Sequence, residues 1–525
     1  MSEKNYSRWT EQNEFEEIVG IEKINPSESV LEKAGIPMLG SNNELWIDTN
    51  CTHNLIIGAL GSGKTQATVL PLLNICAKAG ESVIVTDMSG ELYKETANTF
   101  KDKGYDVLVL NFKNPDLGNR WNPLMYPYSL YKNELKDKAM ELLDDIGYNI
   151  MHEDSSADPF WEKTSSDYLV GLALGLFNDG TLDEINFSSI SLMAADGDEK
   201  IDNSNYAKEY FSSKGKESST YINASTTIFA PNETRGSILS VFKQKMKIFT
   251  AREILAETLA GNDINLSQLG NKKTIIYVIL PEESKYTYPL ATMFIKQCYE
   301  ALVANTNRKS KVNFIFDNFD DLPPIKDINL LLTQARGKNI GFNLVIKSYP
   351  LLNEKYGRDM AELIKSSCSN IVYLLSNDFE TMQEISLYCG DSGNNEPLIT
   401  VDALKRLDYW EAIILKVREM PIKTKLTPNY KIGWNENKEE SILEKRELKE
   451  IKKFDIRRYV NSLKMKKIDA KISSDYTINS TDDLISKIDA KIEELDRTEK
   501  KQVIDKPIKR MVIENNIVTI YFEGE

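Results

Sequence analysis

The chain has 525 residues, of which 41% are hydrophobic and 27% charged, as in an ordinary folded protein. This length exceeds what one hydrophobic core usually supports, so two or three domains are expected. The formal charge of −14 excludes a protein that coats nucleic acid with its whole surface. The charge is uneven, because residues 401–525 carry 27 Lys and Arg against 24 Asp and Glu, whereas residues 1–400 are strongly acidic.

The five cysteines contain no CxxC pair and there are two histidines, which argues against zinc and iron–sulfur sites and indicates reduced, cytosolic thiols. The N-terminus is polar and lacks the apolar core of a signal peptide. No apolar run reaches the roughly 18–20 residues of a membrane-spanning helix. The sequence predicts a cytoplasmic chain without a transmembrane segment, and any membrane attachment is expected to come through a partner.

Residues 1–45 are predicted to form a polar lead-in with helical and turn character. Residues 46–130 then alternate short apolar strands with helices, an order typical of a parallel sheet with crossover helices. The strands expected here span 55–57, 82–86 and 107–110, and the helices span 64–79 and 91–103.

Over residues 131–262 the strand pattern lapses and apolar residues take helical spacing, which predicts an inserted all-α domain. The strand pattern returns over residues 263–420, so this stretch is predicted to complete one α/β domain with 46–130 around a central, mostly parallel sheet. Its expected strands span 273–280, 312–316, 342–346, 370–375 and 412–417, with a helix at 289–303. Residues 421–525 are predicted to be a charged, mainly helical extension that ends in a β-hairpin at 510–514 and 517–522.

A glycine-rich loop carries the clearest chemistry. Residues 58–65 read GALGSGKT, fit G-x-x-x-x-G-K-[ST], and stand between a strand and a helix, as this phosphate-binding motif requires. The glycines let successive amides point at phosphate, and the helix N-terminus adds a favourable partial charge. The residues expected to contact the nucleotide are Gly58, Gly61, Ser62, Gly63, Lys64 and Thr65. The motif predicts a RecA-like P-loop domain that binds ATP with Mg²⁺, with the lysine on the β- and γ-phosphates.

A P-loop also needs a strand that ends in a carboxylate to hold Mg²⁺. The apolar strand 312–316 is followed by Asp317, far along the chain from Lys64. Such spacing does not suit a small kinase or GTPase, but it fits a sheet interrupted by an inserted domain. Thr65 and Asp317 are therefore the predicted magnesium ligands.

Several stretches resemble the type IV secretion coupling proteins, the TraG-like DNA-transfer ATPases of conjugation. They occur in the family's order: HNLIIG (53–58), SVIVTD (82–87), RWNPL (120–124), DPFWE (158–162) and the run from Asp317 to Gly357. The resemblance implies a homo-hexameric motor, peripheral at the inner face of the cell membrane, that meets a secretion channel and membrane-anchored subunits. It implies a relaxase–DNA substrate and ATP-driven movement of single-stranded DNA.

The same resemblance assigns roles to single residues. Arg336 stands where the family has an arginine that reaches a neighbour's nucleotide, which can accelerate phosphoryl transfer by orders of magnitude. The alternative is an exposed helix arginine. Asn318 stands where a glutamate usually activates water, and loss of a general base typically costs about 10²–10⁴ in rate. Lys347 replaces a glutamine that senses the γ-phosphate, and the N-terminal membrane helices common in the family are not predicted here.

Two functions follow from these departures. The first is an active DNA-transfer ATPase, in which Asp320 or Asp321 could replace the missing base only if the turn places one of them over the γ-phosphate. The second is a hydrolysis-impaired docking or regulatory paralogue that binds nucleotide. A cytosolic DNA-processing motor is a third interpretation, against which the WNPL and FWE boxes argue.

Residues 445–467 hold ten basic and three acidic side chains. Such a segment can contact DNA phosphates or an anionic membrane face, and Phe454 and Tyr459 could stack on bases. The alternative is a solvated charged helix. The candidate DNA contacts are Lys452, Lys453, Arg457 and Arg458.

Overall fold

The computed structural model describes residues 6–50, 53–152, 159–308, 310–393, 396–436, 439–475, 486, 488–490, 508–514 and 517–522. The chain divides into two compact units, Met1–Ile456 and Arg457–Glu525. The elements of the first unit position the candidate site.

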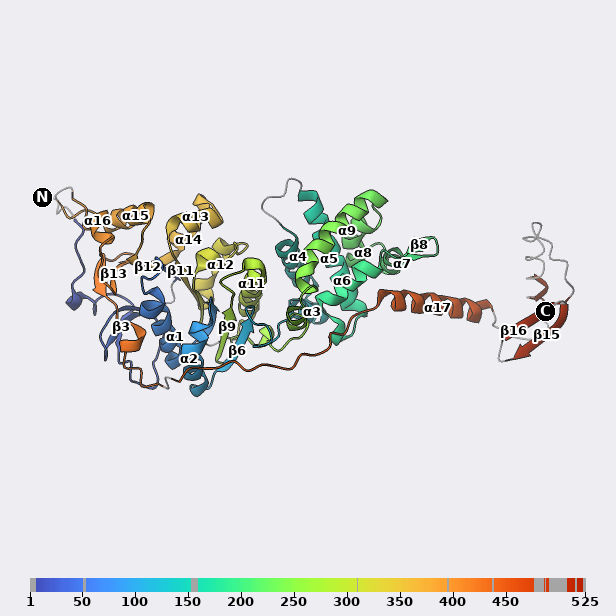
Figure 1. Ribbon diagram of the computed structural model, residues 1–525, viewed down its shortest axis with the longest axis horizontal. Coiled ribbons are helices and arrows are strands. Elements are labelled where there is room, and N and C mark those ends of the chain that lie inside the picture. The colour runs from blue at the N-terminus through green and yellow to red at the C-terminus, as the bar shows by residue number, and fades with distance from the viewer. Residues whose placement is uncertain are drawn as a thin grey trace. The chain divides into compact units, whose positions relative to one another are not determined.

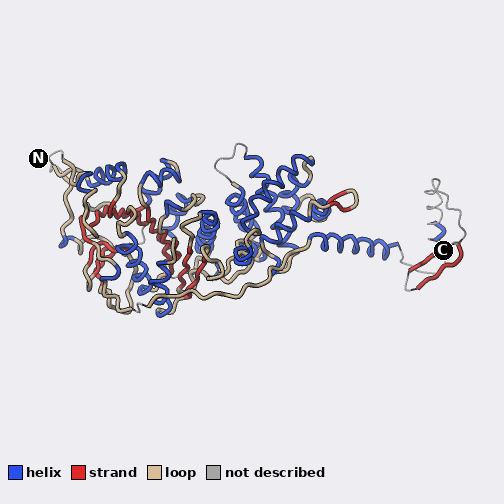
Figure 2. The backbone as a smooth tube through the Cα atoms, viewed as in Figure 1, coloured by secondary structure: helices blue, strands red, loops and turns tan. Residues whose placement is uncertain are grey.

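A nine-stranded sheet forms the core of the α/β part of the first unit, in the order β14-β13-β12-β4-β11-β10-β5-β9-β6 (Figures 1 and 2). Its strands are β4 (His53–Gly58), β5 (Ser82–Asp87), β6 (Asp106–Asn111), β9 (Thr274–Ile279), β10 (Val312–Phe316), β11 (Ile340–Ile346), β12 (Cys368–Leu375), β13 (Glu411–Lys416) and β14 (Ile422–Lys425). The strands from β12 to β6 pair in parallel, and β13 and β14 add antiparallel pairs at one edge. The predicted α/β fold with a mostly parallel central sheet is confirmed.

Helices cover both faces of this sheet, as expected where parallel strands are joined by crossovers. Figure 1 shows α1 and α2 on one face and α12, α13 and α14 on the other. The connecting helices are α1 (Leu70–Ala79), α2 (Glu91–Asp102), α11 (Tyr288–Ala304), α12 (Ile328–Ala335), α13 (Tyr349–Tyr356), α14 (Arg358–Ser367), α15 (Phe379–Cys389) and α16 (Val401–Leu404).

The described residues of the segment 1–45 contain the predicted turns, but the prediction of helical character is wrong. Apart from the short helix η1 (Gln12–Glu14), the described part of this segment has strands β1 (Ile21–Ile24) and β2 (Ile36–Gly40), which pair with β3 (Leu45–Asp48) in an antiparallel sheet. These strands have four or five residues, too few for a periodic signal in the sequence. Their apolar side chains join the same core as α1, so the segment is part of the first unit's packing.

Between residues 131 and 262 the described residues contribute no strand to the nine-stranded sheet. The helices here are α3 (Met125–Lys132), α4 (Lys136–Met151), α5 (Pro159–Asp179), α6 (Phe187–Asp196), α7 (Tyr206–Ser212), α8 (Ser219–Ile228), α9 (Asn232–Met246) and α10 (Glu253–Thr258), beside a small hairpin of β7 (Lys200–Ile201) and β8 (Ser204–Asn205). Helix α5 packs against α4, α6, α8 and α9 and is buried on nearly all sides, which explains its continuous apolar run. Gly171 permits the close approach of α8, because a Cβ there would lie 2.8 Å from that of Ala224.

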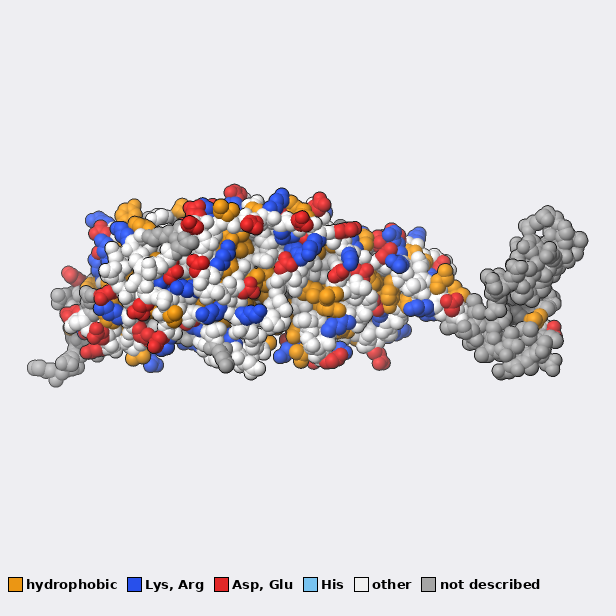
Figure 3. Space-filling view, turned by 90° about the horizontal axis from the view of Figure 1, so that it is seen from below, with side chains coloured by type: hydrophobic (Ala, Val, Ile, Leu, Met, Phe, Trp, Pro, Cys, Tyr) orange, Lys and Arg blue, Asp and Glu red, His pale blue; other side chains and the backbone are white. Residues whose placement is uncertain are grey.

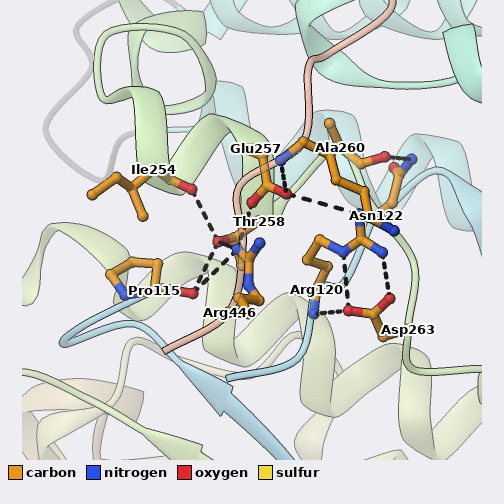
Figure 4. A network of polar contacts seen from close by, with 10 residues as sticks. Pro115, Arg120, Asn122, Ile254, Glu257, Thr258, Ala260, Asp263 and Arg446 are labelled. Carbon is orange, nitrogen blue, oxygen red and sulfur yellow. Dashed lines mark hydrogen bonds and ion pairs between the residues drawn. The ribbon is translucent and has the colours of Figure 1, made fainter. Parts of the chain in front are cut away.

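The prediction of a mainly helical segment beyond residue 420 is also wrong for its first part. After β14 and the short helix η9 (Asn429–Lys431), residues 439–455 run without helix or strand as a C-terminal strap. In Figure 4 the Arg446 guanidinium donates to Thr258 Oγ1 at 2.6 Å and pairs with Glu257 at 2.5 Å. The Asn186 side chain donates to the Lys452 carbonyl at 2.9 Å. The strap thus joins the α/β part to the helical part.

The second unit begins with most of α17 (Ile456–Asp475), the part of the extension that is helical as predicted. Strands β15 (Ile508–Glu514) and β16 (Ile517–Phe522) pair antiparallel, which confirms the expected hairpin strands. The two predicted turn residues, 515 and 516, lie outside the described residues. Within the described part of the chain, no helix has the length and apolar character needed to cross a bilayer.

A buried histidine links the phosphate-loop strand to its neighbours. His53 Nδ1 accepts a hydrogen bond from the Phe342 amide at 3.1 Å, so Nε2 carries the proton and donates to the Leu332 carbonyl at 2.7 Å. Burial lowers the pKa of His53 to about 4. The neutral imidazole is therefore a structural bridge between β4, β11 and α12.

This bridge predicts a pH-dependent stability. The unfolded chain binds a proton at His53 below pH ~6.5, whereas the folded chain resists it down to about 4, so stability is full above ~6.5 and falls as the pH drops. Between pH 7.5 and 5.5 the expected loss is roughly 1 kcal/mol. The measurement is the thermal midpoint across this range for the parent and for His53→Gln, which should have the shallower slope. Equal slopes would contradict the assignment.

Candidate nucleotide-binding site

Three of the predicted site segments meet at the carboxyl-terminal end of the parallel strands. Strands β4, β11 and β10 are parallel neighbours, so their carboxyl ends lie side by side. The glycine loop follows β4, Lys347 follows β11 and Asp317 follows β10. In open parallel sheets ligands bind at this edge. The topology therefore brings the loop and the predicted magnesium carboxylate together.

The glycine loop has the backbone that its sequence predicts. Gly61 and Gly63 have φ angles of +77° and +81°, in the left-handed region that favours glycine. A Cβ on Gly58 would lie 2.3 Å from Ser62 Oγ. The chain then enters a π-helical turn, η2 (Thr65–Val69), which continues into α1. The loop is thus followed directly by a helix N-terminus, the arrangement that binds phosphate.

Charged side chains of opposite sign lie buried beside the loop. Lys64 is 7% exposed, and burial lowers its pKa, against the opposing effect of Asp317. Asp317 is 9% exposed, and burial raises its pKa to about 6 although Lys64 favours the charged form. Buried charges need partners. Lys64 and Asp317 supply part of each other's charge compensation.

Buried oxygens without hydrogen-bond partners gather around these two residues. In the described structure they are Ser62 Oγ, Asp317 Oδ1 and Asp320 Oδ1. Such orphaned groups are rare in folded proteins and indicate a missing ligand, ion or water. Carboxylate and hydroxyl oxygens are the ligands that Mg²⁺ prefers, so the site fits Mg²⁺ held by Asp317 and Thr65, with phosphates on the loop amides and Lys64.

The turn after Asp317 places Asp320 at the site and holds Asp321 elsewhere. Asn318 has a φ of +56°, and η7 (Phe319–Asp321) follows. Asp320 Oδ2 accepts a hydrogen bond from the Lys347 amide at 2.8 Å, which fixes the carboxylate between the ends of β10 and β11. Burial raises the pKa of Asp320, against the effect of that hydrogen bond. Asp320 was only a conditional candidate from sequence, because its position depends on the turn.

Lys347 is engaged by a neighbouring carboxylate. Its Nζ pairs with Asp321, which also pairs with Lys285 at 2.9 Å. Burial alone would raise the pKa of Asp321, but the hydrogen bonds from Lys347 and Lys285 bring it below its usual range. The lysine that replaces the family's glutamine therefore faces Asp321 in this structure.

Arg336 does not join the site of its own chain. It lies in η8 (Arg336–Lys338), before the amino end of β11, whereas the glycine loop follows the carboxyl end of the parallel strand β4. Its guanidinium donates to the Ser367 carbonyl at 2.8 Å and to Ser369 Oγ at 2.9 Å. Arg336 and the glycine loop therefore lie at opposite ends of the parallel strands, so Arg336 could reach only a nucleotide bound to another copy of the chain.

The candidate DNA contacts divide between the strap and the second unit. Lys452 pairs with Asp183 at 2.7 Å at an exposed position, and Lys453 is exposed. The expectation that Phe454 stacks on bases is wrong, because its side chain is 5% exposed and packs near Tyr210. Arg457 and Arg458 belong to α17. Figure 3 shows basic and acidic side chains interspersed over one face of the first unit.

Comparison with known proteins agrees with this geometry. A family model described as "Type IV secretory system Conjugative DNA transfer" matches residues 8–396. The type IV secretion system-coupling proteins VirD4 of Bartonella henselae and Bartonella quintana are each 22% identical over 355 residues, which are 66% of this chain and 54% of theirs. The chain thus spans about half the length of the curated relatives it matches.

Solved structures show the same fold. The plasmid coupling protein TrwB in complex with ADP and Mg²⁺ is 12% identical and has a TM-score of 0.59, covering 84% of this chain and 96% of that one. TrwB with the GTP analogue GDPNP is 13% identical with a TM-score of 0.60, covering 81% and 94%. The likeness agrees with the predicted RecA-like architecture.

Proposed function

Because the chain belongs to the family of type IV secretion coupling proteins, which its match over residues 8–396 shows, we propose that it binds ATP with Mg²⁺ and uses ATP hydrolysis to drive single-stranded DNA into a secretion channel. The observation that carries this proposal is the set of orphaned buried oxygens of Ser62, Asp317 and Asp320 around the glycine loop. A TrwB structure with ADP and Mg²⁺ supports it by fold.

In the proposed reaction the chain's own residues bind phosphate, orient water and take up its proton. The loop amides and Lys64 hold the β- and γ-phosphates, and Asp317 with Thr65 holds Mg²⁺, which supplies charge neutralisation at the transferring phosphoryl group when bound. Asp320 orients the attacking water through Oδ1 and accepts its proton, while the Lys347 amide holds Oδ2. Its raised pKa makes it a stronger base than an ordinary aspartate.

We further propose that the chain works as a homo-hexamer at the inner face of the cell membrane, held there by membrane-anchored subunits of the secretion system, and receives DNA with a relaxase. The position of Arg336 supports the oligomer, because it lies at the end of the strands opposite to the glycine loop. Its guanidinium could therefore reach only the nucleotide of a neighbouring subunit. The Ser367 carbonyl and the Ser369 hydroxyl, which accept its hydrogen bonds, are neutral and do not offset the charge of the guanidinium. Charge on the γ-phosphoryl group is what such an arginine stabilises.

A second candidate function is a nucleotide-binding docking or regulatory subunit that turns over slowly or not at all. The observation that favours it is the pair of changes at Asn318 and Lys347. Asn318 cannot accept a proton, and Lys347 is bound to Asp321. The position and orphaned oxygen of Asp320 favour the active enzyme.

The basic segment gives a prediction for DNA binding. Replacing Lys452, Lys453, Arg457 and Arg458 by Gln should weaken binding of a single-stranded oligonucleotide and flatten its salt dependence, since each lost phosphate contact lowers the slope by about 0.7. The measurement is fluorescence anisotropy across a salt series. Loss of the Lys452–Asp183 surface pair should cost little stability. Unchanged affinity and an unchanged salt slope would show that the basic segment does not bind DNA and is a solvated charged segment.

The cellular test uses DNA transfer. In the cell that carries this chain, removing its gene should abolish conjugative transfer of a mobilisable plasmid, and the parent chain should restore it. Asp317→Asn should fail to restore transfer despite normal abundance, because the magnesium ligand is weakened. Full transfer without the chain, or with Asp317→Asn, would contradict the proposed function.

A further inference from the structure

The indole of Trp410 lies against the glycine loop, and no motif accounts for this contact. A Cβ on Gly63 would lie 2.5 Å from Trp410 Cζ3 and 3.1 Å from Cη2, so the indole is in contact with the loop backbone. The ring of Tyr430 stands next to it, with centroids 6.3 Å apart and planes at 72°. Glycine is therefore required at position 63 for two reasons: its φ of +81° disfavours other residues, and a side chain there would clash with the indole.

The backbone of Trp410 is held in an unusual conformation. Its φ is +72°, in the left-handed region that a bulky residue rarely adopts. Trp410 immediately precedes β13, and its carbonyl accepts a hydrogen bond from the Leu426 amide at 2.8 Å. Strained residues of this kind cluster at ligand sites, where the surrounding structure keeps them in place. Here the strain accompanies an indole set against the phosphate loop.

Tyr430 is positioned by the helix that carries it. Helix η9 packs against η2, the turn that follows the loop. Asn429 Oδ1 accepts hydrogen bonds from Asn74 Nδ2 at 3.0 Å and Trp434 Nε1 at 2.8 Å, which ties η9 to α1. Tyr430 itself is 59% exposed, although the helix that carries it packs against the first unit's core. Its ring is thus accessible beside the start of the helix that follows the loop.

A nucleotide on the loop would bring its base to this side. The loop amides cradle the α- and β-phosphates, while Lys64 reaches the β- and γ-phosphates, so the α-phosphate, which carries the ribose and base, lies on the loop backbone. Trp410 contacts that backbone at Gly63, and η9, which carries Tyr430, packs against η2 beside it. We propose that Trp410 and Tyr430 form a stacking platform for the nucleobase of a nucleoside triphosphate. This inference rests on the proposed nucleotide binding at the glycine loop.

Stacking of this kind has a recognisable specificity. Every base has a π face, so an aromatic platform adds affinity with little preference among bases. The platform predicts that ATP and GTP bind with affinities within a few fold of each other. Removing one ring should weaken either nucleotide by about tenfold or more. It should not affect a ligand that has phosphates and no base.

The test is calorimetric titration of the full chain with ATP, GTP and inorganic tripolyphosphate, each with Mg²⁺. Tyr430→Ala and Trp410→Ala should weaken ATP and GTP by about tenfold or more and leave tripolyphosphate unchanged. Tyr430→Phe keeps the ring and should bind like the parent. Tyr148→Ala removes an exposed tyrosine of α4 and serves as the matched control.

The outcomes separate the platform from the site itself. If Tyr430→Ala binds ATP and GTP as the parent does while tripolyphosphate still binds, the platform is overturned and the nucleotide site stands. If Trp410→Ala also loses tripolyphosphate, the indole supports the loop, and the platform then stands only if Tyr430→Ala loses ATP selectively. If the parent binds neither ATP nor tripolyphosphate, the proposed nucleotide site fails.

Discussion

Lys64→Ala is expected to abolish binding of a non-hydrolysable ATP analogue in the presence of Mg²⁺. The lysine ammonium is the only positive side chain of the loop itself, and it lies buried among carboxylates. Without it, Mg²⁺ alone would have to offset the charges of the β- and γ-phosphates and of Asp317 and Asp320. A calorimetric titration measures the loss, which should be roughly 30-fold to several thousand-fold in affinity, since truncating one partner of a buried charge pair costs ~2–5 kcal/mol.

A second lysine provides the matched control. Lys347 lies at the carboxyl end of the neighbouring strand, but its Nζ is bound to Asp321. Lys347→Ala should therefore keep most of the nucleotide affinity, and circular dichroism should show that both variants are folded. Parent-like binding by Lys64→Ala would place the nucleotide elsewhere in the chain.

Asp320→Asn is expected to lower the rate of ATP hydrolysis by about 10²–10⁴, the usual cost of a lost general base. The amide keeps the shape of the side chain and can still accept from the Lys347 amide, so nucleotide binding should change little.

Asn318→Glu should raise the slow intrinsic rate of the parent, because it returns a carboxylate to the position next to the magnesium aspartate. Single-turnover hydrolysis measures both effects.

Asp321→Asn is the control for this pair of variants, since Asp321 is held by Lys347 and Lys285 and its loss removes a carboxylate without removing the proposed base. If Asp321→Asn slows hydrolysis more than Asp320→Asn, the assignment of the base is wrong. If Asn318→Glu slows a fast parent, position 318 does not face the attacking water.

The sequence predicted those features whose signal is local. The loop at 58–65 needs particular backbone angles at Gly61 and Gly63, and only a few residue types supply them. Central strands such as β4 and β10 are buried on both faces and appear as continuous apolar runs. Asp317 was chosen as the candidate magnesium ligand because a P-loop needs a carboxylate after such a strand.

Features that depend on distant contacts were missed. Strands β1, β2 and β14 have four or five residues, and tertiary pairing decides their conformation. The strap has the charge pattern of a solvated helix, yet its Arg446 binds Glu257 and Thr258, which lie almost 190 residues earlier in the sequence. Trp410 lies on Gly63 only because the β13–β14 edge brings it there, and no motif spacing encodes that contact.

The most direct test of the proposed function is ATP hydrolysis by the purified parent chain, measured with and without single-stranded DNA. The proposed motor should show a slow rate that rises when DNA is added and falls to background in Lys64→Ala under both conditions. A parent chain that binds ATP with Mg²⁺, yet hydrolyses it no faster than Lys64→Ala even with DNA present, would contradict the proposed motor and favour the docking subunit.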